Sequence, residues 1–135
     1  ICWSLVGSEM CIRDSNMALT KITSDILADE FNTTDTLTAG ATVNVNFKNA
    51  EVFTLTPNAN TTFNIQNPVV GITKIIVVTG AGSSYTADTW TVGGSSGTFN
   101  RVSGEYDDTS GTKNLIQILC ISATEFWYTI VQPAT

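Results

Sequence analysis

The densest group of side chains that could do chemistry lies in one short polar stretch, where Glu105, Asp107 and Asp108 occur close together. Paired carboxylates can act as acid and base in glycoside hydrolysis, and clustered carboxylates can bind calcium. The neighbouring Gly104 and Gly111 are typical of a solvated turn. We therefore interpret the cluster first as a turn. Cation binding stays open as the second interpretation, and a catalytic role is the least favoured.

Other arrangements that could do chemistry are weaker. The chain contains no histidine, which excludes a Ser-His-Asp or Cys-His site. The Gly-rich segment 80–84 lacks the lysine and the following helix that a phosphate loop needs, so we expect a turn there. Cys2, Cys11 and Cys120 match no zinc spacing, and Cys120 lies in an apolar run. We predict no cofactor, no metal site and no enzymatic activity.

Charge and composition narrow the class of partner. The chain of 135 residues has a formal net charge of −6, and its six basic residues are scattered along it. Binding to nucleic acid or to an anionic membrane surface needs clustered Lys and Arg, so neither partner is expected. Charged residues make up only 13% of the chain. Its polar surface must therefore come largely from Thr, Ser and Asn, which favour strands and turns.

The first residues differ in composition from the rest. Residues 1–15, ICWSLVGSEMCIRDS, resemble the translated remnant of a sequencing adapter, and they lack the basic start of a signal peptide. We expect residues 1–16 to be a non-native leader and Met17 to be the natural start. A helical spacing of apolar residues follows and predicts a short helix or arm over 17–35. The residues with this spacing are Leu19, Ile22, Ile26 and Leu27.

From residue 36 the hydrophobic period changes to two, which indicates half-buried strands. Apolar and polar residues alternate around Val43 to Phe47, Phe53 to Leu55 and Phe63 to Ile65. Turn residues separate these runs. The pattern predicts an all-β domain over 36–135, an antiparallel β-sandwich of the jelly-roll type with about eight strands.

The later strands are apolar on both faces, in the run 75–78 and in the closing hairpin 113–132. A sandwich buries only one face of each sheet, so the other face needs a partner. We predict a homo-oligomer, with a trimer favoured. The residues assigned to this self-association interface are Ile75, Val77, Ile116, Ile118, Phe126, Tyr128 and Ile130.

Aromatic side chains offer a second route to binding, because they can stack on sugar rings. Trp90 and Trp127 lie in expected strands, and we assign both to the core. Tyr85 and Tyr106 lie in expected loops, and they are the candidate ligand-contact residues.

The order of these patterns resembles a known family. The chain from Asn46 to Tyr128 resembles a small β domain of bacteriophage tail fibres and other virion structural proteins. The opening Leu19 to Asp29 is similar to the start of fibre and appendage proteins of marine phages. The segments that support this resemblance are VFTLT at 52–56, NTTF at 60–63, Asn67-Pro68, Gly71, the run 75–78, Trp90, LIQI at 115–118 and FWY at 126–128.

The resemblance implies a non-enzymatic structural protein of the virion that docks on capsid or tail proteins. A single domain without a visible internal repeat favours a capsid decoration protein, a head fibre or a short tail appendage. The alternative is a receptor- or glycan-binding adhesion module of a tail fibre, whose partner would be a host surface glycan.

Overall fold

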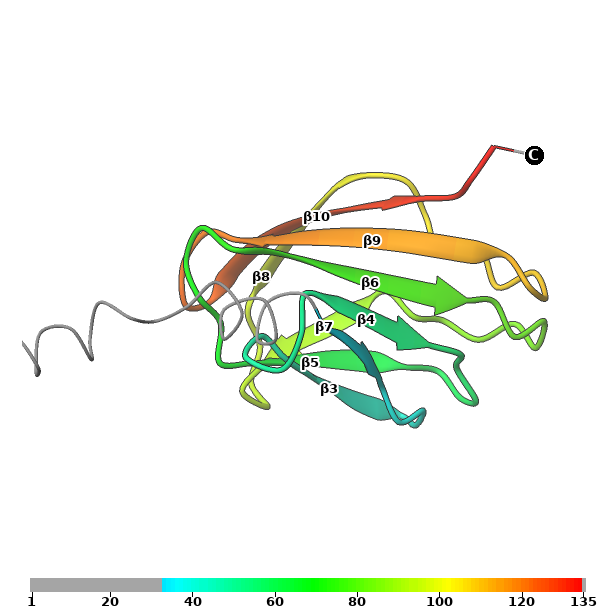
Figure 1. Cartoon of the computed structure of the whole chain (residues 1–135), viewed down its shortest axis with the longest axis horizontal. Coiled ribbons are helices and arrows are strands. Elements are labelled where there is room, and N and C mark those ends of the chain that lie inside the picture. Colours follow the sequence, from blue (N-terminus) through cyan, green and yellow to red (C-terminus); the bar gives the residue numbers. More distant parts are fainter. Residues whose placement is uncertain (1–32, 135) are drawn as a thin grey trace, which may run out of the picture. The chain divides into compact units, whose positions relative to one another are not determined.

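A computed structural model describes residues 33–134, and this part of the chain folds into nine strands without a helix. The strands form one sheet of six and one sheet of three. Figure 1 shows them running along the length of the domain. The strands are β2 (Thr34–Thr36), β3 (Thr42–Asn46), β4 (Val52–Leu55), β5 (Thr62–Gln66), β6 (Thr73–Thr79), β7 (Thr89–Val92), β8 (Thr98–Ser103), β9 (Lys113–Cys120) and β10 (Glu125–Val131).

From β2 to β7 the chain passes back and forth between the two sheets, and each two consecutive strands make one coil. Strands of successive coils are parallel. In the larger sheet Thr34 pairs with Val52, which pairs in turn with Ile75. In the smaller sheet β3, β5 and β7 stack in the same way. This arrangement is a β-solenoid.

The turns between strands continue the stacking of the coils. The amide of Leu37 donates a hydrogen bond to the carbonyl of Thr54 at 2.8 Å, and the amide of Thr62 donates to Ala41 at 2.9 Å. The amide of Phe47 donates to Gln66 at 3.0 Å. Backbone polar groups at the corners therefore find partners in the next coil, as buried backbone groups must.

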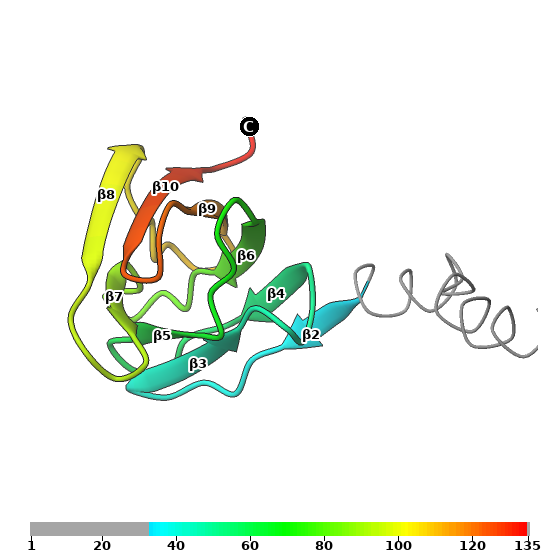
Figure 2. The ribbon, with the colours of Figure 1, turned by 90° about the vertical axis from the view of Figure 1, so that its left-hand side faces the viewer.

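The C-terminal strands complete the larger sheet. β9 pairs antiparallel with β6, β10 pairs antiparallel with β9, and β8 pairs parallel with β10. Figure 2 looks along the strands and shows the larger sheet bending from β8 through β10, β9 and β6 to β4 and β2. The three-stranded sheet lies inside this bend.

The expected antiparallel jelly-roll sandwich is therefore wrong, although the all-β class is right. Alternation of apolar and polar residues indicates which face a strand buries, but not the direction of its neighbour. The early turns would join antiparallel strands of one sheet if they formed hairpins. Each of them instead moves the chain to the opposite sheet, so that strands two apart in sequence become parallel neighbours.

The core lies between the sheets and is closed by aromatic rings. Phe63 lies 4.9 Å from Trp90 between ring centroids, and Tyr128 lies 5.0 Å from Trp90. Phe99 of β8 stacks on Phe126 with centroids 4.9 Å apart. Offset and tilted pairs at these distances are favourable. The rings join β8 and β10 of the larger sheet to the strands of the smaller one.

One charged pair lies in this apolar interior. Lys74 points inward from β6 with 2% of its surface exposed, and its Nζ lies 2.6 Å from the Glu51 carboxylate. Glu51 precedes β4, so the pair links two successive coils. An ammonium group buried without an opposite charge would be strongly unfavourable. The pairing with Glu51 therefore allows Lys74 to lie on the otherwise apolar inner face of β6.

The outer face of the three-stranded sheet is polar. Thr42, Thr62 and Thr89 share one register row, and Asn44, Asn64 and Thr91 share the next. The Asn64 amide donates to Asn44 Oδ1 at 2.8 Å. Its own oxygen accepts hydrogen bonds from the Thr91 hydroxyl at 3.1 Å and from the Gly94 amide at 2.7 Å. These side chains are hydrogen-bonded along the solenoid axis.

The predicted leader 1–16 lies outside the described residues, as does nearly all of the predicted helix or arm over 17–35. The described residues add a short strand, β2, at the end of this predicted segment. In the part of the chain that is described, no helix is long and apolar enough to cross a membrane.

Candidate interaction surfaces

Asp108, from the predicted carboxylate cluster, holds the Gly-rich loop that follows β6. Its carboxylate accepts hydrogen bonds from the amides of Ala81, Ser83 and Tyr85 at 2.9 to 3.0 Å. It also accepts one from the Tyr106 hydroxyl at 2.8 Å. Desolvation raises the pKa of Asp108, but these hydrogen bonds outweigh it and lower the pKa to about 2.

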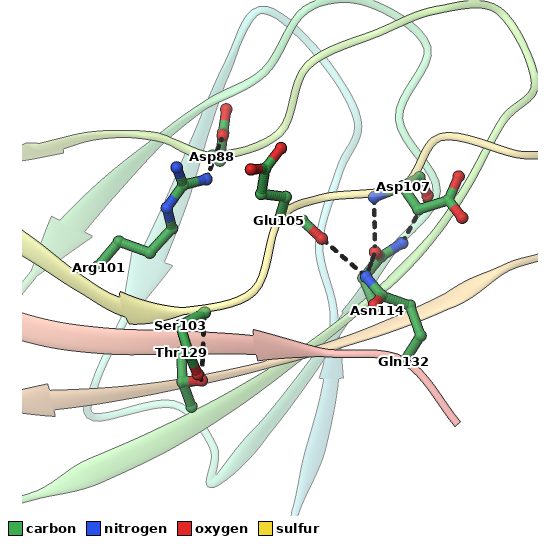
Figure 3. Close-up of polar contacts among 8 residues, drawn as sticks. All are labelled: Asp88, Arg101, Ser103, Glu105, Asp107, Asn114, Thr129 and Gln132. Carbon is green, nitrogen blue, oxygen red and sulfur yellow. Dashed lines mark hydrogen bonds and ion pairs between the residues drawn. The ribbon is translucent and has the colours of Figure 1, made fainter. Parts of the chain in front are cut away.

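Asn114 of β9 holds the loop between β8 and β9 through hydrogen bonds to the loop backbone. Its side chain is buried, donates to the carbonyl of Asp107 at 2.8 Å and accepts from the amide of Asp107 at 2.8 Å. Gln132 donates to Asn114 Oδ1 at 2.6 Å and to the carbonyl of Glu105 at 2.8 Å. Figure 3 shows this network at the end of the sheet. The loop is thus tied to β9 and to the residue after β10.

These contacts give the cluster a structural role. Both oxygens of Asp108 are used by the protein itself. Asp107 accepts a hydrogen bond from the Thr109 amide within its own turn. Glu105 is exposed. Among the described residues no group of three or more Asp, Glu, Cys or His side chains is placed to hold a metal ion. The geometry agrees with the turn interpretation of this stretch.

The two predicted ligand-contact tyrosines both lie beside the Asp108 carboxylate. The Tyr106 hydroxyl is bound by Asp108, and its ring packs against the core cluster. Desolvation first, and then this hydrogen bond, raise the pKa of Tyr106 above its ordinary range. Tyr85 is half-buried, and its amide is held by the same carboxylate. The structure thus brings both together at one loop cluster, where Tyr106 has a structural contact.

The residues assigned to the self-association interface fall on two different faces. Ile75 and Val77 of β6 are half-buried and point outward from the larger sheet. The other five are in the core, with at most 7% of their surface exposed. They are Ile116, Ile118, Phe126, Tyr128 and Ile130.

The register identifies the outward residues that surround Ile75 and Val77. Val77 pairs with Leu115, which pairs with Val131 on the next strand. Ile75 pairs with Val52 on its other side. These five residues, Val52, Ile75, Val77, Leu115 and Val131, cross four strands and are called the apolar strip below. None of them is charged, and Val131 is 45% exposed.

A second feature of the same face lies toward the other end of the strands. Trp127 of β10 is 47% exposed and pairs with Leu119, which pairs with Thr73. An open groove of about 420 Å³ lies over these residues and is called the Trp127 groove. Its lining residues are Thr73, Val102, Gln117, Leu119, Trp127, Tyr128 and Thr129.

The indole of Trp127 is held in a fixed direction. Its Nε1 donates a hydrogen bond to Glu125 Oε1 at 3.0 Å, and the Asn100 amide donates to the same oxygen at 3.4 Å. Val102, which is 64% exposed, lies at an irregularity in the pairing of β8 with β10. The ring is therefore exposed while its polar atom already has a partner.

Sequence reasoning placed Trp127 in the core and left out Leu115 and Val131. The polar residues of the hairpin contained the missing signal. Gln117 has the same parity as Leu115 and Leu119 along β9. Glu125 and Thr129 have the same parity as Trp127 and Val131 along β10. Because successive side chains point to opposite faces, several polar residues of one parity favour that parity as the outward one.

Comparisons with family models, with curated proteins and with solved structures yield no match to this chain.

Proposed function

We propose that this domain is a non-enzymatic structural module of a bacteriophage particle, which self-associates through the apolar strip of its six-stranded sheet. The observation that supports the proposal is the strip itself. A β-sheet in a protein of net charge −6 exposes outward Val, Ile and Leu side chains on adjacent strands. Exposed apolar patches of this kind mark interaction sites.

The chemistry of the strip favours a second copy of the chain as its partner. Two acidic molecules repel one another, so contact between copies needs a surface without charge. The five side chains of the apolar strip are all aliphatic. In a trimer, the strips of three copies would face the threefold axis, and each copy would contact the next through a heterologous contact. The number of copies is part of the proposal, with a trimer expected.

The non-enzymatic part of the proposal is supported by the use of the acidic cluster. Asp108 is bound by three amides and one hydroxyl of the chain, which leaves it without a free position for a substrate proton. The virion part rests on the resemblance of the strand and turn patterns to phage structural proteins.

Self-association through the apolar strip can be tested by introducing one charged side chain. We expect the full chain to self-associate at micromolar concentration in analytical ultracentrifugation, and Val77→Lys to be monomeric because its ammonium would be buried in the contact. Thr89→Lys places the same charge on an exposed position of the three-stranded sheet and is expected to leave association unchanged. Circular dichroism checks that both variants fold. A wild-type monomer, or equal loss in both variants, contradicts the proposal.

The particle assignment needs a separate measurement. Peptides from residues 33–134 should be detected by mass spectrometry in phage particles purified from a sample that contains the gene. Their copy number relative to the major capsid protein should be constant between preparations. A protein found only in the soluble fraction after particle removal contradicts a virion location.

A further inference from the structure

The Trp127 groove combines features that the apolar strip lacks. The strip is aliphatic, whereas the groove has one exposed indole next to hydroxyl and amide side chains. Leu119 and Trp127 form its apolar part. Thr73 and Gln117 are exposed beside them and offer hydrogen-bond donors and acceptors. A flat aromatic surface next to planar amides and hydroxyls suits a ligand with one apolar face and a polar edge.

The volume and the rigidity of the groove set the size of this ligand. At about 420 Å³ the groove lies near the lower end of the range for small-molecule sites. Its indole is already oriented by Glu125 at 3.0 Å, so little side-chain ordering is needed on binding. A ligand of one or two rings fits these limits.

The charges determine which class of such ligand is accepted. Among the described residues, no Lys or Arg lines the groove, and the Glu125 carboxylate is hydrogen-bonded to the indole of Trp127. The whole chain has a net charge of −6. Phosphate, sulfate and carboxylate groups would meet repulsion there without a cation to offset it. The ligand should therefore be neutral.

We propose that the Trp127 groove binds a neutral sugar ring, which stacks its C–H face on the indole and hydrogen-bonds to Gln117 and Thr73. The sugar hydroxyls point outward from the edge of the ring, where these two side chains lie. This proposal is distinct from self-association through the apolar strip, because the two features share no residue, although Ile75 of the strip pairs with Gln117 of the groove.

The test uses the full chain and the Trp127 Nε1–H resonance in heteronuclear NMR. The probes are the methyl glycosides of glucose, galactose, mannose and N-acetylglucosamine, with methyl glucuronide as the anionic probe. We expect at least one neutral glycoside to shift this resonance with a millimolar dissociation constant. Methyl glucuronide should bind more weakly than methyl glucoside.

Variants locate the binding. Trp127→Ala should weaken binding, followed by the Gln117 resonances, by about tenfold. Trp127→Phe should retain part of it, and Gln117→Ala should weaken it without unfolding, since both side chains are on the surface. Tyr85→Ala is the matched control at the other aromatic candidate and should have no effect.

Three outcomes overturn the proposal. The first is that no glycoside shifts the Trp127 resonance. The second is equal binding by Trp127→Ala and the wild type, which would place the sugar elsewhere. The third is that the groove resonances change only with protein concentration, which would make a second copy of the chain its occupant. The monomeric Val77→Lys variant separates the proposals, because it should still bind the glycoside.

Discussion

The two outer faces of this domain are built on strands of the same coils, yet their side chains behave in opposite ways. On the three-stranded sheet Asn64 is 7% exposed and bonds to the side chains of Asn44 and Thr91 in the neighbouring coils. On the six-stranded sheet the outward side chains of Val77 and Leu115 have no polar atoms to satisfy and are half-buried. The polar side chains of a row can form their hydrogen bonds within one chain. Outward apolar side chains are removed from water only when another surface covers them.

The largest change in the free energy of unfolding is expected from the charged pair in the interior, which lies between the two faces. Glu51→Gln removes the charge that compensates Lys74, whose side chain is only 3% exposed. Because Glu51 is itself one-third exposed, the loss is expected at the lower end for buried pairs, about 3 kcal/mol. Urea unfolding followed by circular dichroism measures this change.

Lys74→Met is the matched control for this pair. It removes the buried charge itself and leaves Glu51 able to reach solvent, so its stability should lie within about 1 kcal/mol of the wild type. If Glu51→Gln were as stable as Lys74→Met, the interior would tolerate an unpaired ammonium group. The rule that a buried polar group needs a partner would then not hold in this protein, and it could not explain the difference between the two faces.

The second effect tests the polar face directly. Asn64→Leu removes three hydrogen bonds, from Asn64 to Asn44 and to it from Thr91 and Gly94, and should lower the unfolding free energy by about 2 kcal/mol. Leu115→Asn makes the opposite exchange on the apolar strip and should cost less than about 1 kcal/mol. Both are measured by urea unfolding at a concentration where the protein is monomeric. Equal losses would mean that the two faces contribute to stability in the same way.

A smaller effect concerns pH and the loops beyond both faces. The pKa of Asp108 is lowered to about 2, below the value near 3.9 of an unfolded aspartate. Its stabilising contribution is therefore complete above about pH 4 and is lost as the pH falls through about 2. Asp108→Asn should flatten this part of the stability curve, measured by thermal unfolding between these pH values. An unchanged acid limb in Asp108→Asn would show that another carboxylate is responsible.

The sequence was sufficient to predict the strands and their buried faces but not their arrangement. The alternation in TVNVN at 42–46 and TFNIQ at 62–66 correctly gives Val43, Val45, Phe63 and Ile65 as core residues. The same two segments also contain the repeat of the solenoid, a threonine followed two positions later by an asparagine. The repeat was missed because TWTV at 89–92 replaces the asparagine and the intervals between coils are unequal.

The outward apolar face was predictable, but the residues that form it were not. The two-sided apolar strands correctly indicate an outward apolar face, but the five core residues that were assigned to it have the wrong parity. Parity depends on which neighbour a strand pairs with, and the pairing of β9 between β6 and β10 is a tertiary feature. The role of Asp108 was equally beyond local patterns, because its three amide partners lie more than twenty residues earlier in the chain.

The smallest change in the free energy of unfolding is expected for a variant whose self-association should change strongly. Replacing Thr42, Thr62 and Thr89 together by valine keeps the shape of one register row and removes its hydroxyls. These positions are at the surface of a strand, where valine is as favourable as threonine, so each change should alter stability by about 0.5 kcal/mol or less.

The polar face would then expose an aliphatic row like the apolar strip. We expect this variant to form larger assemblies in analytical ultracentrifugation, while the matching triple change to serine leaves the sedimentation unchanged. If the valine variant did not associate further, exposed aliphatic rows alone would not drive contact between copies, and the shape of the apolar strip would have to supply the difference.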